Sequence, residues 1–266
     1  MSEMQTPVPS ASEGVGILDV VADIKQVYEN AIKSGTLLNL IRSQGLIQKL
    51  HEGVKREFVN LGVAPELISP HPGISKPEVS VEGYLNPKQQ DIVIFTQDAP
   101  GVITEKIIAV NVRSQLSSLG NNLDTLYERT YAESLNLHLK YPRMCLGEVF
   151  MIPTHQYDAK AAQKGIVDFK KVTKLEDYIQ RFQQINNGGN AGRKRKLEDV
   201  FKYERVCLLV VDFCETEPKI YSSDQELLEA GFVSQPVNME HLAFRNFAQD
   251  LLEVHKQRFA TVDLGL

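Results

Sequence analysis

The chain has 266 residues, of which 42% are hydrophobic, and a formal net charge of -5. This length and composition suit one large α/β body with a sizeable core, and no apolar run approaches the ~18 residues of a membrane helix. The acidic balance disfavours a protein that binds nucleic acid only through non-specific phosphate contacts, but it is compatible with a local basic cleft.

The first residues differ in composition from the rest of the chain. Residues 1–16 are rich in Ser, Pro and Glu and lack a basic start followed by an apolar core. We therefore expect a disordered N-terminal tail followed by a single domain over residues 17–266. Cys145, Cys207 and Cys214 stand in apolar settings and are not spaced as metal pairs. They predict buried thiols in a reducing cytoplasm.

Hydrophobic periodicity predicts the elements in chain order. Helical spacing indicates helices at 17–34, 37–61 (broken near Gly45), 123–140, 175–185, 224–230 and 240–259. Alternating or continuous apolar runs indicate strands at 78–85, 92–95, 107–112, 146–152, 205–213 and 219–221, and the prolines of 63–77 indicate a linker. This order predicts an α/β (or α+β) fold with a mixed central sheet flanked by helices.

Polar residues border two neighbouring strands of this predicted sheet. Asp91 precedes the strand at 92–95, and Asn111 and Arg113 lie at alternate positions where the next strand ends. Two adjacent strands of this kind place an acid and a polar cluster side by side, as in metal-dependent phosphodiesterases. Mg²⁺ prefers oxygen ligands and usually takes one or two carboxylates. The alternative is that Asp91 only closes the turn after Pro87.

The order of residues in this region resembles a known family. Pro87 and Asp91 precede the first strand, and Ser114-Gln115 followed by Gly120-Asn121-Asn122 comes after the second. In the order and spacing of these residues, the chain is similar to type II restriction endonucleases of the PD-(D/E)xK nuclease superfamily. The similarity covers roughly residues 77–151. The resemblance implies a restriction-endonuclease-like fold, Mg²⁺-dependent cleavage of both strands of a specific double-stranded DNA site, and a cytoplasmic homodimer.

Two residues depart from the family pattern. Asn111 and Arg113 stand where the pattern has Glu and Lys. Asn offers a metal an oxygen but no charge, and Arg keeps a positive charge but cannot act as a base. Either a second carboxylate comes from elsewhere, or the site binds without catalysis. Some branches of the superfamily take this acid from a helix, so we expect Glu128 to point toward Asp91 and share its metal. Glu133 is the alternative, and both could be ordinary solvated acids.

Further residues are candidates for DNA contact. Ser114 and Gln115 could touch backbone phosphates, which would position a duplex without reading its sequence. Arg193, Lys194 and Arg195 belong to a basic tract after a Gly- and Asn-rich loop. This tract either orders on DNA or is a solvated charge run.

Other function classes have weaker support in the sequence. The six histidines are scattered without metal spacing, so no zinc site is predicted. A metabolic α/β enzyme is disfavoured because no cofactor motif is present. A catalytically inactive nuclease-fold module that binds DNA or another partner remains the main alternative to the nuclease.

Overall fold

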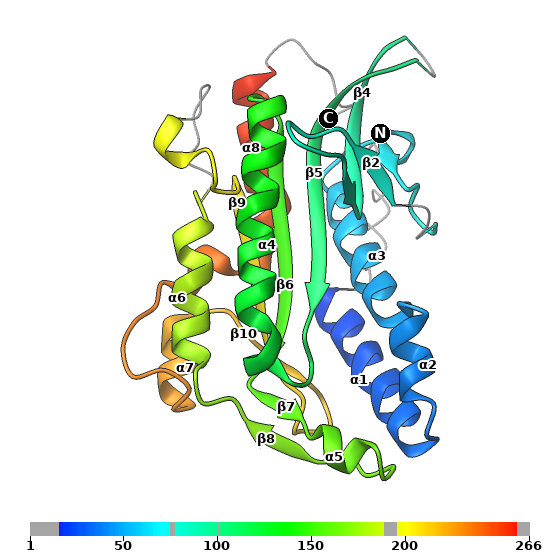
Figure 1. The fold of residues 1–266 in the computed structure, drawn as a ribbon, viewed down its shortest axis with the longest axis vertical. Helices are drawn as coiled ribbons and strands as arrows, with labels where there is room; N and C mark the ends of the chain where they lie inside the picture. Colours follow the sequence, from blue (N-terminus) through cyan, green and yellow to red (C-terminus); the bar gives the residue numbers. More distant parts are fainter. Residues whose placement is uncertain (1–15, 75–77, 100–101, 189–195, 260–266) are drawn as a thin grey trace, which may run out of the picture.

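The computed structural model describes residues 16–74, 78–99, 102–188 and 196–259. The expected tail over residues 1–16 therefore lies outside the described residues, apart from Gly16. The chain forms three layers, with a central sheet between two layers of helices (Figure 1). This confirms the predicted α/β class with a mixed sheet flanked by helices.

The main sheet has six strands in the order β1-β4-β5-β6-β9-β10. Their bounds are β1 Ile68–Ser69, β4 Ile92–Ala99, β5 Val102–Ser114, β6 Cys145–Pro153, β9 Arg205–Asp212 and β10 Lys219–Tyr221. The three central strands β5, β6 and β9 are parallel, and the other neighbours pair antiparallel. Two hairpins lie outside it, β2 Val79–Val81 with β3 Lys88–Gln90, and β7 His155–Tyr157 with β8 Phe169–Lys171.

One face of the sheet is covered by α1 (Ile17–Lys33), α3 (Gly45–Asn60) and α8 (Phe247–Arg258). Their apolar residues pack on side chains such as Val110 of β5 and Val149 of β6. The short helix α2 (Leu37–Arg42) precedes α3, and Gln44 between them has a left-handed φ of 58°. The predicted break near Gly45 is confirmed.

The opposite face is covered by α4 (Leu119–Lys140), which connects β5 to β6, and by α6 (Leu175–Ile185). Figure 1 shows α4 running along β6 in front of the sheet. Because side chains alternate along a strand, Asn111 and Arg113 share this face with Ala109 of β5. The same alternation puts Glu148 on the α4 side of β6, between Leu146 and Phe150. Polar residues therefore lie in the core layer beneath α4.

Several predicted boundaries were wrong. Gly120-Asn121-Asn122 belongs to the first turn of α4 and not to a turn before it. The linker expected at 63–77 contains η1 (Pro65–Leu67) and the edge strand β1, because Ile68 is buried when β1 pairs with β4.

The remaining elements are short and complete the chain. They are α5 Ala159–Ala162, η2 Leu197–Asp199, α7 Asp224–Glu229, η3 Met239–Leu242 and η4 Phe244–Asn246. The helix expected at 240–259 is thus two 3₁₀ turns followed by α8. Among the described residues, no helix combines the length and the apolar character needed to cross a membrane.

Candidate functional site

Asp91 lies between β3 and β4, beside the end of β5. The backbone N–H of Val112 donates to Asp91 Oδ2 at 2.8 Å, and the Asp91 N–H approaches Asn111 Oδ1 at 3.4 Å. The antiparallel pairing of Ile92 with Val110 produces this arrangement, since it sets Asp91 opposite Asn111. The Asp91 side chain is 17% exposed, so solvent still reaches its carboxylate.

Glu133 of α4 contacts this strand pair. Its Oε1 accepts hydrogen bonds from Asn111 Nδ2 at 2.6 Å and from Gln90 Nε2 at 2.5 Å. The Glu133 side chain is 10% exposed. The Glu133 carboxylate of α4 therefore contacts the side-chain amide of Asn111 on β5.

The expectation that Glu128 points toward Asp91 is wrong. Glu128 is exposed on α4, whereas Glu133 is buried. An α-helix turns by about 100° per residue, so side chains five positions apart differ in direction by roughly 140°. A signal for this was present in the sequence, because Glu133 lies three residues after Thr130 and four before Leu137, at helical spacing from two residues that are buried.

Arg113 connects β5 to two acids on other elements. Its Nη2 donates to Glu133 Oε2 at 2.9 Å, and its Nε lies 2.9 Å from Glu148 Oε1 of β6. The two carboxylates raise the pKa of Arg113, and Glu148 contributes most. The Arg113 side chain is 21% exposed. It is therefore a fixed, permanently charged group with one edge accessible to solvent.

Sequence reasoning missed Glu148. It is the one acid in β6, all nine residues of which are buried, and it pairs in register with Asn111. The pKa of Glu148 is raised to about 8, chiefly by burial and also by the nearby Glu133 and Asp91, while the charge of Arg113 acts in the opposite direction. Its Oε2 has no hydrogen-bond partner among the described residues. An isolated acid within an apolar central strand was the signal that could have identified it.

His51 of α3 approaches the cluster from the other side. Its Nε2 lies 3.5 Å from Asp91 Oδ1, and neither ring nitrogen has a hydrogen-bond partner in the described part of the chain. Burial and the charge of Lys55 lower the pKa of His51 to about 4, so its ring is neutral at neutral pH. Burial raises the pKa of Asp91 to about 6, although the Val112 hydrogen bond and the charge of Arg113 act in the opposite direction.

The charges of this cluster fit a divalent cation. Asp91 offers a partly exposed carboxylate and Glu133 and Glu148 offer two buried ones, and among the described residues the guanidinium of Arg113 pairs with both buried acids. The donors are hard oxygens, which suit Mg²⁺. Among the described residues, the group of three possible ligand atoms that all lie within 4.8 Å of one another is elsewhere in the fold. The oxygens of the three acids are therefore farther apart than this distance. At their present positions no more than two of these carboxylates could share one ion, and water molecules would complete its ligands.

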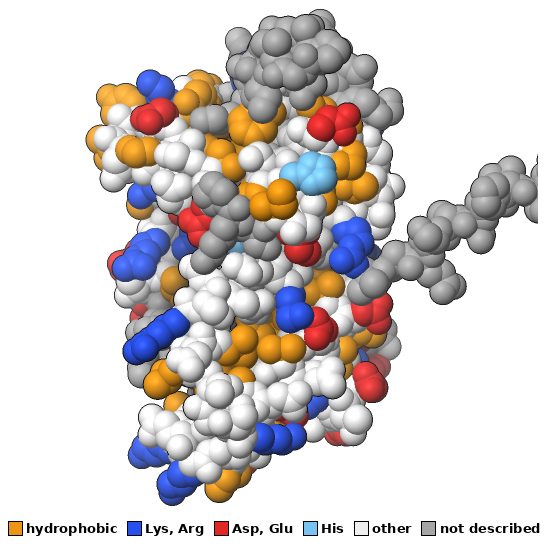
Figure 2. Space-filling model, turned by 90° about the vertical axis from the view of Figure 1, so that its right-hand side faces the viewer, with side chains coloured by type: hydrophobic (Ala, Val, Ile, Leu, Met, Phe, Trp, Pro, Cys, Tyr) orange, Lys and Arg blue, Asp and Glu red, His pale blue; other side chains and the backbone are white. Residues whose placement is uncertain are grey.

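A groove leads from the surface to Arg113. Its volume is about 370 Å³, and Ser114 and Gln115 also line it, together with residues of α2 and α3. The Gln115 side chain donates to the carbonyl of Ser117. Arg193, Lys194 and Arg195 lie outside the described residues. Basic and acidic side chains are interspersed on the face shown in Figure 2, so contacts to phosphate there would be local.

The structure thus brings Asp91, Asn111 and Arg113 together, adds Glu133 and Glu148, and leaves Glu128 outside. No family model matches the sequence, and neither a curated protein nor a solved structure matches it.

Proposed function

We propose that the chain is a Mg²⁺-dependent nuclease that cuts both strands of a specific DNA sequence, as a type II restriction endonuclease with a restriction-endonuclease-like fold does. The observation that carries this proposal is the hydrogen bond from Asn111 to Glu133. It supports a site in which a carboxylate from α4 replaces the acid that the strand lacks. With Asp91, Glu133 completes the pair of acids that a magnesium site uses.

The protein groups have separate roles in this proposal. Asp91 and Glu133 would hold the ion, because they are the acids of the cluster with some solvent access. When bound, Mg²⁺ polarises the scissile phosphate and lowers the pKa of a water molecule. Glu148 is fully buried and serves to hold Arg113. The catalytic set is therefore Asp91, Glu133 and Arg113, with Asn111 orienting Glu133.

Arg113 is suited to stabilise negative charge on the phosphate. Glu133 and Glu148 fix its Nη2 and Nε, while the side chain is 21% exposed and Arg113 is one of the residues that line the groove. A donor that is already oriented can contribute about 3 kcal/mol to a transition state. Arg113 does not deprotonate at accessible pH, so it cannot be the base that activates water.

The remaining parts of the proposal concern the partner. Double-stranded DNA would approach along the groove, where Ser114 and Gln115 offer a hydroxyl and an amide to backbone phosphates. A homodimer is proposed because cutting a two-fold symmetric site requires two equivalent active sites. The proposed location is the cytoplasm, where such a protein meets DNA.

A second candidate is a nuclease-fold module that binds DNA without cutting it. The two ion pairs of Arg113 favour this second candidate, because the guanidinium already neutralises part of the carboxylate charge that a metal ion would otherwise compensate. It predicts sequence-specific binding that does not depend on magnesium.

Incubation with supercoiled plasmid DNA separates the two candidates. With Mg²⁺ the nuclease gives linear products whose ends map to one sequence. The Asp91→Ala variant should lose cleavage but retain DNA binding, since losing a carboxylate reduces repulsion of phosphate. Glu128→Gln is the matched control, because Glu128 is an exposed acid of α4 and its loss should leave cleavage unchanged. Specific binding without cleavage by the parent would favour the inactive module.

A further inference from the structure

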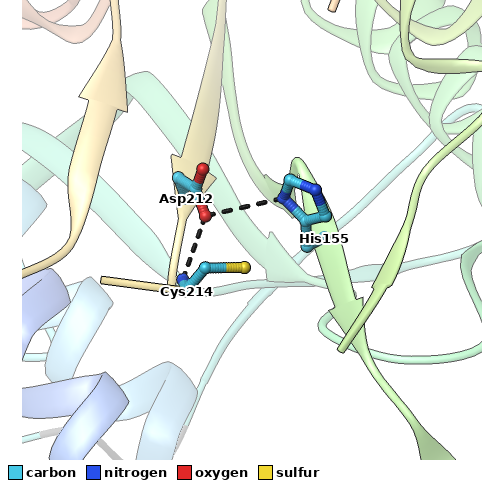
Figure 3. A group of neighbouring side chains, drawn as sticks. All are labelled: His155, Asp212 and Cys214. Atoms are coloured by element: carbon cyan, nitrogen blue, oxygen red, sulfur yellow. Dashed lines mark hydrogen bonds and ion pairs between the residues drawn. The ribbon is translucent and has the colours of Figure 1, made fainter. Parts of the chain in front are cut away.

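A second cluster of chemically reactive side chains lies at the ends of β6 and β9. His155 Nδ1 is 3.6 Å from Asp212 Oδ1, and the same oxygen accepts a hydrogen bond from the backbone N–H of Cys214 at 3.0 Å. Figure 3 shows one oxygen of the Asp212 carboxylate joined by dashed lines to the His155 ring and to the backbone nitrogen of Cys214. One ligand atom from each of the three residues lies within 4.8 Å of the other two.

The parallel pairing of β6 and β9 creates this cluster. Parallel neighbours end at the same edge of a sheet, and the Thr154 N–H extends the pairing by donating to Val211 O at 2.8 Å. His155 follows directly in β7, while Asp212 ends β9. Residues far apart in sequence therefore meet, which is why the spacing of histidines and cysteines predicted no metal site.

We propose that His155, Asp212 and Cys214 bind Zn²⁺. Imidazole nitrogen, carboxylate oxygen and thiolate sulfur are the three ligand types that zinc takes in proteins. The thiolate separates this site from the carboxylate cluster around Asp91, because soft sulfur ligands select zinc and disfavour magnesium. The chain would then hold two different divalent ions at two separate places.

The geometry requires only a small adjustment. Zinc bonds of about 2.0–2.3 Å at tetrahedral angles put ligand atoms roughly 3.3–3.8 Å apart. The His155–Asp212 pair already meets this range at 3.6 Å. A closure of about 1 Å brings any atom at the 4.8 Å limit to the same distance. The Thr154 hydroxyl, 3.2 Å from His155 Nδ1, can rotate away when that nitrogen binds the ion.

An entry path and a fourth ligand are both accessible. Cys214 is exposed and lines a cavity of about 730 Å³ between α1 and the segment that follows β9. Three protein ligands leave one position of a tetrahedral ion for water. The bound ion would join β7 to the end of β9 and so fix the β7–β8 hairpin on the sheet.

Cobalt provides a direct optical test on the full-length chain. The protein is stripped with a chelator and titrated with Co²⁺ in the presence of excess Mg²⁺, which saturates hard oxygen sites. Binding should produce a sulfur-to-cobalt charge-transfer band, which Zn²⁺ then abolishes with a stoichiometry of one ion per chain. Cys214→Ser should lack the band, and His155→Asn should weaken zinc binding roughly tenfold or more. His71→Asn is the matched control, because His71 is an exposed histidine outside the cluster.

The proposal is overturned if the parent shows no charge-transfer band, or if Cys214→Ser keeps it. It is also overturned if His71→Asn weakens zinc binding as much as His155→Asn does. Substitution of the exposed Cys214 should leave the fold intact, which circular dichroism verifies. None of these measurements involves DNA cleavage, so their outcome is independent of the proposed nuclease activity.

Discussion

Replacing Asp91 with Asn should stabilise the metal-free protein above neutral pH. The pKa of Asp91 rises from 3.8 in an exposed chain to about 6 in the fold, chiefly because burial disfavours the charged carboxylate. A shift of about 2 units corresponds to about 3 kcal/mol that ionised Asp91 costs the folded state. Asn keeps an oxygen that can accept the Val112 hydrogen bond, but it carries no charge.

The sign of the pH dependence follows from proton uptake. The folded pKa of Asp91 is higher than the unfolded one, so between the two values the folded state binds more protons and its stability falls as pH rises. Below about pH 4 Asp91 is protonated in both states and costs nothing, and above about pH 6 the full cost is present. The stability of Asp91→Asn relative to the parent should therefore increase by about 3 kcal/mol across this interval.

Urea denaturation followed by circular dichroism, with a chelator present, measures this difference. Magnesium at 1,000 times its dissociation constant should then reverse the order of stability, because the bound ion adds about 4.1 kcal/mol to the parent alone. Asp168→Asn is the control, since Asp168 is exposed and its change should alter stability little at any pH. A difference between Asp91→Asn and the parent that does not vary with pH would refute the reasoning.

Three further predictions concern neighbouring residues. Glu133→Gln should abolish plasmid cleavage and weaken Mg²⁺ binding measured by calorimetry, while Glu128→Gln changes neither; equal cleavage by both variants would contradict the role of Glu133. Arg113→Ala leaves two buried carboxylates without their cation, so it should lose cleavage and destabilise the fold by about 3–5 kcal/mol, whereas Arg113→Lys retains measurable cleavage. Gly147→Ala would place a Cβ 2.7 Å from Phe247 Cζ, so urea denaturation should show a loss of about 1–3 kcal/mol.

Much of the fold follows from local patterns in the sequence. The apolar stripe of α6 and the continuous apolar runs of β6 and β9 each specify an element, because periodicity depends on neighbouring residues only. The break before α3 was equally local. The edge strand β1 was not predicted, since two residues among prolines form a strand only when β4 supplies the hydrogen-bond partners.

For the site, the sequence determined that Asp91, which precedes one strand, would lie beside Asn111 and Arg113 of the next strand, since a short connection makes neighbouring runs pair. The packing of α4 on the sheet decided which acid joins these residues. The orientation of α4 about its own axis buried Glu133 and exposed Glu128. The contributions of Glu148 and of the cluster around Cys214 came from the parallel pairing of β5, β6 and β9. Contacts between residues distant in sequence are set by packing over the whole core, because burial and pairing energies are gained only when the complete sheet and its helices assemble.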